Sequence, residues 1–212
     1  MKRFHRKRPP VITNPKAHLQ ANYGREWTFL RANRVRQYRC LNMNLFSGQN
    51  HCSLAAVAAL SRFYRDQGFV CFPAEDQEIY GFVYHYASQK KMYFKKIGTF
   101  TFFMGKMAKA LWRRVGYFVH TKNYLCLIQE EKIQRLLMGE VDGQRPCIVS
   151  FTGGQYRRHS LILYGYLIYE KEGEEKVYYL VNDLWSNRPR FVDGTSLANP
   201  FVTMVQVLTL WP

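Results

Sequence analysis

Long apolar runs, paired cysteines and acidic residues are all scarce in this 212-residue chain. No stretch approaches the roughly 18 consecutive apolar residues that can cross a bilayer, so no membrane-spanning segment is expected. The first residues, MKRFHRKRPPVITNP, carry charge but no apolar run of the kind found in a secretory signal. Together these absences predict a cytoplasmic protein.

The chain has five cysteines and no C-x-x-C pair. This pattern favours free thiols in a reducing compartment over a disulfide framework. No close pairs of Cys or His supply the four ligands of a structural zinc site, so neither a metal nor another cofactor is expected. Because free cysteine is usually a small buried hydrophobe, four of the five are predicted to be structural: Cys40, Cys71, Cys126 and Cys147.

Acidic residues are nearly missing from two segments of the chain, whose net charge is +16. Residues 1–39 hold eleven Lys or Arg against the single acid Glu26, and residues 90–122 hold nine against none. Such blocks can attract nucleic acid, acidic polymers or an anionic membrane face, or can be a basic arm and solvated helix faces. The aromatic residues interleaved with the second block are interpreted as its core side: Phe94, Phe100, Phe102 and Phe103.

The composition, 47% apolar and 22% charged, is that of a globular protein, and the length fits one domain. Helical periodicity covers residues 53–67, 76–91, 101–114 and 129–138, the last ending near Gly139. Runs rich in β-branched and aromatic residues follow at 145–151, 159–170, 176–182 and 202–210. Helices followed by strands predict an α+β fold with an antiparallel sheet. We expect a basic N-terminal arm and lead-in over 1–39, loose over 1–16, and a single domain over 40–212.

One cysteine stands directly ahead of an alanine- and leucine-rich helical run, in SGQNHCSLAAVAALSRFYRDQG, residues 47–68. If Cys52 begins that helix, its sulfur lies among unpaired backbone N–H groups at the positive end of the helix dipole. This position favours the thiolate, the form in which cysteine is a nucleophile. The alternative is a small core residue.

A histidine and an aspartate are predicted to meet at one end of a hairpin. Folding the strand that begins at His159 back through the turn EKEGEEK brings Asp183, at the end of the next strand, beside it. A carboxylate there can fix the tautomer of an imidazole and stabilise its charged form. Taken singly, His159 could be a strand-edge histidine bonded to the backbone, and Asp183 could be a turn residue that follows a strand.

From residue 44 to residue 187 the sequence resembles the papain-like cysteine peptidases, and among them the bacterial double-glycine peptidases that trim bacteriocin leaders, with their stand-alone relatives. The resemblance is carried by GQNHCSLAAVAAL, LLMGEVDGQRPCIVSF, RRHSLILYGY and YYLVNDLWS. It implies a papain-like fold with Cys52 as nucleophile, His159 as general acid and base, and Asp183 as the orienting residue. Asn182 is the alternate for the third role, and Trp185 is implied to shield the pair.

The resembled families place an oxyanion-donating glutamine five or six residues before the cysteine, where this chain has Ser47 and Phe46. Gln49 is therefore the candidate donor, with Asn50 and Asn44 as alternates and a surface-loop glutamine as the other interpretation. The glycine usually found after the cysteine is Ser53.

The leading hypothesis is a thiol amide hydrolase that cleaves a peptide or isopeptide bond, with a peptide or protein substrate that can be acidic. A thiol acyltransferase would use the same residues. The second hypothesis is a catalytically silent member of the fold that binds an acidic protein or nucleic acid through its basic segments.

Overall fold

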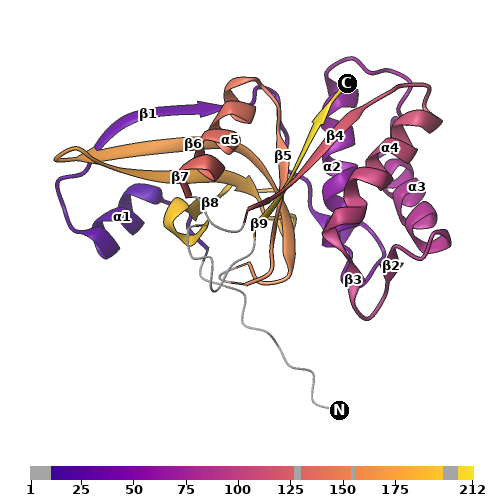
Figure 1. Cartoon of the computed structure of the whole chain (residues 1–212), viewed down its shortest axis with the longest axis horizontal. Helices are drawn as coiled ribbons and strands as arrows, with labels where there is room; N and C mark the ends of the chain where they lie inside the picture. The colour runs from indigo at the N-terminus through magenta and orange to yellow at the C-terminus, as the bar shows by residue number, and fades with distance from the viewer. Residues whose placement is uncertain (1–10, 127–129, 154–155, 198–204) are drawn as a thin grey trace, which may run out of the picture.

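The structure, a computed structural model, describes residues 11–126, 130–153, 156–197 and 205–212, and it has the α+β architecture that the sequence predicts. The helices are α1 (Pro15–Tyr23), α2 (Cys52–Asp66), α3 (Asp76–Gln89), α4 (Met104–Arg114) and α5 (Glu130–Asp142), with short 3₁₀ turns η1 (Met43–Leu45), η2 (Thr101–Phe103) and η3 (Gly194–Leu197). The strands are β1 (Thr28–Arg34), β2 (Tyr93–Phe94), β3 (Gly98–Thr99), β4 (His120–Cys126), β5 (Cys147–Phe151), β6 (His159–Lys171), β7 (Glu174–Asn182), β8 (Arg190–Asp193) and β9 (Val205–Trp211). Helices α2, α3 and α4 form a group on one side of the molecule, and the sheet occupies the other (Figure 1).

The main sheet has seven antiparallel strands in the order β4-β9-β5-β6-β7-β8, with β1 also paired to β6. Strand β6 is central: β7 lies along one edge, while β5 and β1 pair with successive parts of the other. The β6–β7 hairpin turns through Glu172 and Gly173, both at positive φ, as a two-residue turn of type I′ requires. This tight turn sets the register that brings the far ends of the two strands together.

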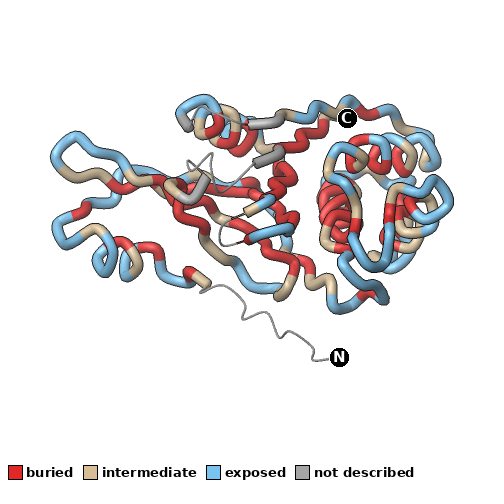
Figure 2. Tube along the Cα trace, turned by 60° about the horizontal axis from the view of Figure 1, so that its bottom comes forward, coloured by how far each residue is buried: buried red, intermediate tan, exposed pale blue. Residues whose placement is uncertain are grey.

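The alanine-rich helix α2 is the centre of the larger core. Every residue from Ser53 to Tyr64 is buried, and the small alanines let α3, α4 and the sheet approach closely. The same core cluster includes Ile148, Ile162 and Leu208 from the sheet, so the helical group and the sheet share one core. In Figure 2 the buried trace runs through α2 and the central strands, whereas the tip of the β6–β7 hairpin is exposed.

Most predicted helices and strands are confirmed within the described residues, with ends that shift by a few positions. The predicted end near Gly139 is wrong, because α5 continues to Asp142 and the chain turns at Gln144, whose φ is +57°. Residue 129 and residues 202–204 of the predicted segments lie outside the described residues. The sequence did not predict α1, β1, β4 or β8.

The N-terminal lead-in and the basic segment 90–122 differ from the expectation in two places. The prediction of a loose arm is wrong from Ile12 onward, because Ile12 is buried and its carbonyl accepts a hydrogen bond from the Phe191 amide. Residues 1–10 lie outside the described part, and the boundary at residue 39 stays a prediction. The predicted core side of segment 90–122 is wrong for Phe94, Phe100 and Phe102, which are exposed, and Phe103 is only half-buried.

Among the described residues, no helix is both long enough and apolar enough to cross a membrane.

Candidate active site

Cys52 is the first residue of α2, where the sequence predicted it. His51 precedes the helix and Asn50 has a φ of +51°, so the chain turns sharply just before the cysteine. This loop is tightly packed: a Cβ at Gly48 would come within 2.7 Å of the Tyr80 hydroxyl and 2.8 Å of the His51 ring. Only glycine therefore fits at position 48. The loop leads directly into α2, so the half-buried Cys52 is held at the positive end of that helix.

His159, the first residue of β6, lies beside Cys52 and is buried. Its Nε2 is 2.7 Å from the backbone carbonyl oxygen of Asp183. Because a carbonyl can only accept, Nε2 carries the proton and donates it, which leaves Nδ1 as the ring nitrogen available to the Cys52 thiol. The hairpin thus brings His159 and Asp183 together, but through the main chain of Asp183 and not through its carboxylate.

The carboxylate of Asp183 instead shapes the turn that presents this carbonyl. Its Oδ1 accepts hydrogen bonds from the backbone amides of Trp185, at 3.0 Å, and Ser186, at 3.3 Å. Leu184, which lies between Asp183 and Trp185, is buried and has a φ of +61°, an unfavourable conformation for a leucine. The turn is therefore held in an unusual shape that aims the Asp183 carbonyl at the imidazole.

Two aromatic rings cover the imidazole. The Trp185 ring stacks on His159 with a centroid separation of 4.2 Å, and Tyr156 stacks on Trp185 at 5.5 Å. The shielding role that the resemblance implies for Trp185 stays a prediction. No sequence pattern pointed to Tyr156, which comes from the loop before β6.

The environment of the two side chains stabilises a thiolate beside an imidazolium. Burial alone would raise the pKa of Cys52, but hydrogen bonding and charge from His159, with weaker hydrogen bonds from the Ser160 amide and the Ser53 hydroxyl, lower that pKa to about 7. Burial alone would lower the pKa of His159, but Cys52 and the Asp183 carbonyl raise it above its ordinary value. Both pKa shifts favour the charged pair at neutral pH.

A chain of three buried serines lies next to the pair. The Ser53 hydroxyl is 3.0 Å from that of Ser160, which is 2.8 Å from that of Ser150. These bonds connect α2 to β6 and β5, so the helix that holds Cys52 is fixed to the strand that holds His159. Sequence reasoning missed this chain because nothing in the sequence marks which hydroxyls meet across separate elements.

The candidate oxyanion donors differ in what their amides already contact. Asn50 Nδ2 donates to the carbonyls of Lys95, at 2.9 Å, and Lys96, at 3.2 Å, so this amide is occupied. Asn44 Nδ2 lies 3.5 Å from the Trp185 carbonyl. Gln49 is exposed, and its side-chain amide makes no hydrogen bond to another described residue, while its backbone is bonded to the Tyr93 hydroxyl. A donor role for Gln49 stays a prediction.

The side-chain amide of Asn182, the alternate third residue of the site, has hydrogen-bond partners other than His159. Its side chain is buried and bonds both backbone groups of Leu41: Oδ1 accepts from the amide at 2.8 Å and Nδ2 donates to the carbonyl at 3.0 Å. Nδ2 also donates to the Ser186 carbonyl at 3.1 Å. Asn182 therefore anchors the Asp183 turn to residues 38–41 and does not bond His159.

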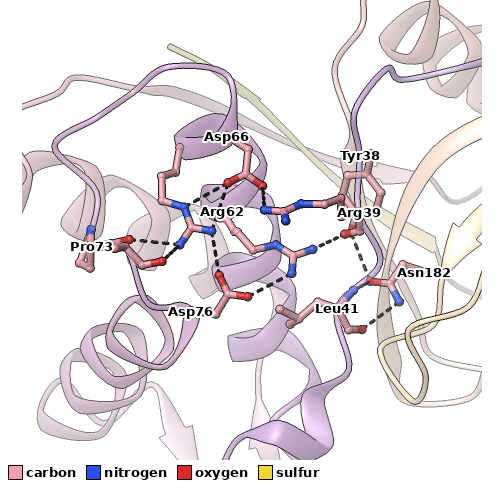
Figure 3. Close-up of polar contacts among 10 residues, drawn as sticks. Tyr38, Arg39, Leu41, Arg62, Asp66, Pro73, Asp76 and Asn182 are labelled. Atoms are coloured by element: carbon pink, nitrogen blue, oxygen red, sulfur yellow. Dashed lines mark hydrogen bonds and ion pairs between the residues drawn. The ribbon is translucent and has the colours of Figure 1, made fainter.

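Residues 38–41 are in turn bonded to α2 (Figure 3). The buried guanidinium of Arg62 donates to the Arg39 carbonyl and pairs with Asp76 of α3 at 3.1 Å, while the Arg39 side chain pairs with Asp66 at 2.6 Å. This charged network and Asn182 connect the nucleophile helix to the turn that orients the imidazole.

Of the remaining cysteines whose side chains are described, none has a comparable setting. Burial raises the pKa of Cys147 and also that of Cys40. Cys71 is exposed, so the prediction that it is a buried structural residue is wrong. The side chain of Cys126 lies outside the described residues. No model of a known protein family matches the sequence, and a search of curated proteins returns no match.

Proposed function

We propose that the protein is a papain-like cysteine peptidase, or a closely related thiol amide hydrolase, with Cys52 as nucleophile and His159 as general acid and base. The observation that carries the proposal is the placement of Cys52, the first residue of α2, beside the buried imidazole of His159, whose influence lowers the thiol pKa to about 7. A buried cysteine that only fills space has no need of an imidazole partner, and Cys147 in this same chain shows the opposite pKa shift. The α+β arrangement of helices followed by an antiparallel sheet supports the papain-like assignment.

In the proposed reaction the Cys52 thiolate attacks the carbonyl carbon of an amide and forms a C–S bond. The Cys52 backbone N–H, at the unpaired start of α2, and the Gln49 amide are the proposed donors to the oxyanion. As the C–N bond breaks, His159 transfers the proton from Nδ1 to the leaving amine. Water, deprotonated by the now neutral His159, then hydrolyses the thioester and releases the acid.

Cleavage of a diverse peptide library, followed by mass spectrometry, tests this proposal. We expect new peptide termini with the unaltered chain and none with Cys52→Ala. The matched control is Cys71→Ala, which removes an exposed thiol outside the site and should leave cleavage unchanged. Equal cleavage by the unaltered chain and Cys52→Ala would mean that another protein in the sample or another residue is responsible, and no cleavage by either would reject hydrolysis of peptides.

A further inference from the structure

The β2–β3 hairpin and the start of η2 expose apolar and basic side chains together. The exposed apolar residues are Phe94, Ile97, Phe100 and Phe102, with exposed fractions of 43%, 73%, 52% and 54%. Five exposed lysines lie close to them in the sequence: Lys90, Lys91, Lys95, Lys96 and Lys106. None of these lysines forms an ion pair with a carboxylate in the described part of the chain. We name this set of nine residues the hairpin surface.

The hairpin surface is bonded to the loop that precedes Cys52. The Asn50 amide donates to the Lys95 and Lys96 carbonyls, and the Tyr93 hydroxyl bonds the backbone of Gln49. Gly98, at a φ of +92°, lets the hairpin approach so closely that an added Cβ would be 2.8 Å from the Asn50 carbonyl oxygen. The hairpin is therefore held against Asn50, which precedes the nucleophile Cys52 by two positions in the sequence.

A pocket of about 350 Å³ lies where this loop meets the hairpin. It is lined by Ser47, Gly48, Gln49, Tyr84, Tyr93 and Lys95. Its volume is at the lower end of the range for small-ligand sites, enough for a side chain or a short stretch of peptide. Lys95 belongs to both the pocket and the hairpin surface, so the two are continuous.

We propose that the pocket and the hairpin surface bind the substrate on one side of the cleaved bond, and that the bound segment is acidic and carries large apolar side chains. The inference rests on the proposed function. Unpaired lysines favour carboxylates by charge complementarity, and exposed aromatic rings favour an apolar partner. Segment 90–122 contains no acid, so nothing within it neutralises the lysines.

The test measures binding, without turnover, to the full chain carrying Cys52→Ala. The probes are two fluorescein-labelled peptides, one of Glu, Phe and Gly and one with Gln in place of every Glu, followed by fluorescence anisotropy. We expect the acidic peptide to bind more tightly, and Lys95→Glu with Lys96→Glu to weaken its binding about tenfold, since the substitutions replace attraction to carboxylates by repulsion. Phe102→Ser is expected to weaken both peptides.

The matched control is Lys16→Glu with Arg25→Glu, which makes the same change of net charge at two exposed residues, one in α1 and one just after it. Helix α1 lies at the far end of the sheet (Figure 1). It should leave binding unchanged, and melting curves by circular dichroism check that every variant is folded. Equal binding of the two peptides, equal weakening by both charge-reversed pairs, or tighter binding of a single-stranded oligonucleotide would overturn the inference. Failure of this inference can be told apart from failure of the proposed function, because the alkylation rate of Cys52 in the unaltered chain tests the reactivity of the nucleophile without any peptide.

Discussion

At the scale of single residues, the imidazole of His159 is oriented by a main-chain carbonyl. The Asp183 carboxylate acts one step away, by accepting the Trp185 and Ser186 amides and so fixing the turn. It also contributes a weaker charge effect that raises the pKa of His159. The site therefore uses residue 183 mainly as an acceptor for two amides, while its negative charge faces Arg190 at 3.9 Å and acts only weakly on the imidazole.

This distinction predicts different effects for two substitutions of Asp183. Asp183→Asn keeps an oxygen that can accept both amides, so we expect the alkylation rate of Cys52 at neutral pH to fall less than about threefold. Asp183→Ala leaves two partly buried N–H groups without their acceptor, at a cost of about 1–3 kcal/mol, and should slow alkylation about tenfold or more. If Asp183→Asn is as damaging as Asp183→Ala, the carboxylate charge itself controls the imidazole.

At the scale of elements, Asn182 at the end of β7 connects the helical group to the sheet through Leu41. Asn182→Ala removes two hydrogen bonds to the buried backbone of Leu41, one to the Ser186 carbonyl and one from the Tyr38 hydroxyl, and should lower the free energy of unfolding by about 2 kcal/mol. Urea denaturation measures this effect. Asn22→Ala is the control, since Asn22 is exposed on α1 and its side chain bonds, among the described residues, only the His18 carbonyl. It should change stability by less than about 0.5 kcal/mol. Equal effects of the two substitutions would contradict a role for Asn182 in holding the turn.

The helices and strands also show which features of the fold could be predicted from the sequence. Helical periodicity and the start of α2 at Cys52 were predictable because both are local, and the turn at Glu172–Gly173 placed His159 near Asp183 through a two-residue hairpin. The choice of carbonyl over carboxylate was not predictable, because it depends on the positive φ of Leu184. The exposure of Phe100 and Phe102 was not predictable either, since an aromatic residue in a segment of mixed pattern is ordinarily assigned to the core.

At the scale of the whole molecule, the candidate site exists only where the helical group and the sheet meet. Cys52 comes from α2, whereas His159 and the Asp183 carbonyl come from the ends of β6 and β7 (Figure 1). The shared core of α2, β5, β6 and β9 keeps the two parts together. The reactivity of one thiol therefore reports on the assembly of the entire fold.

The most direct measurement is the rate of Cys52 alkylation by iodoacetamide as a function of pH, by peptide mass spectrometry. It should be made on the native chain, on His159→Ala and on the urea-unfolded chain. Because the pKa of Cys52 is lowered to about 7, the thiolate persists down to that pH and the native rate should be half-maximal there. The unfolded chain should react appreciably only as the pH approaches about 8.5, the pKa of a free cysteine. The variant, in which the thiol keeps its burial but loses the imidazole, should need that pH or a higher one. A native chain with the same pH profile as the unfolded chain would contradict the proposed thiolate–imidazolium pair.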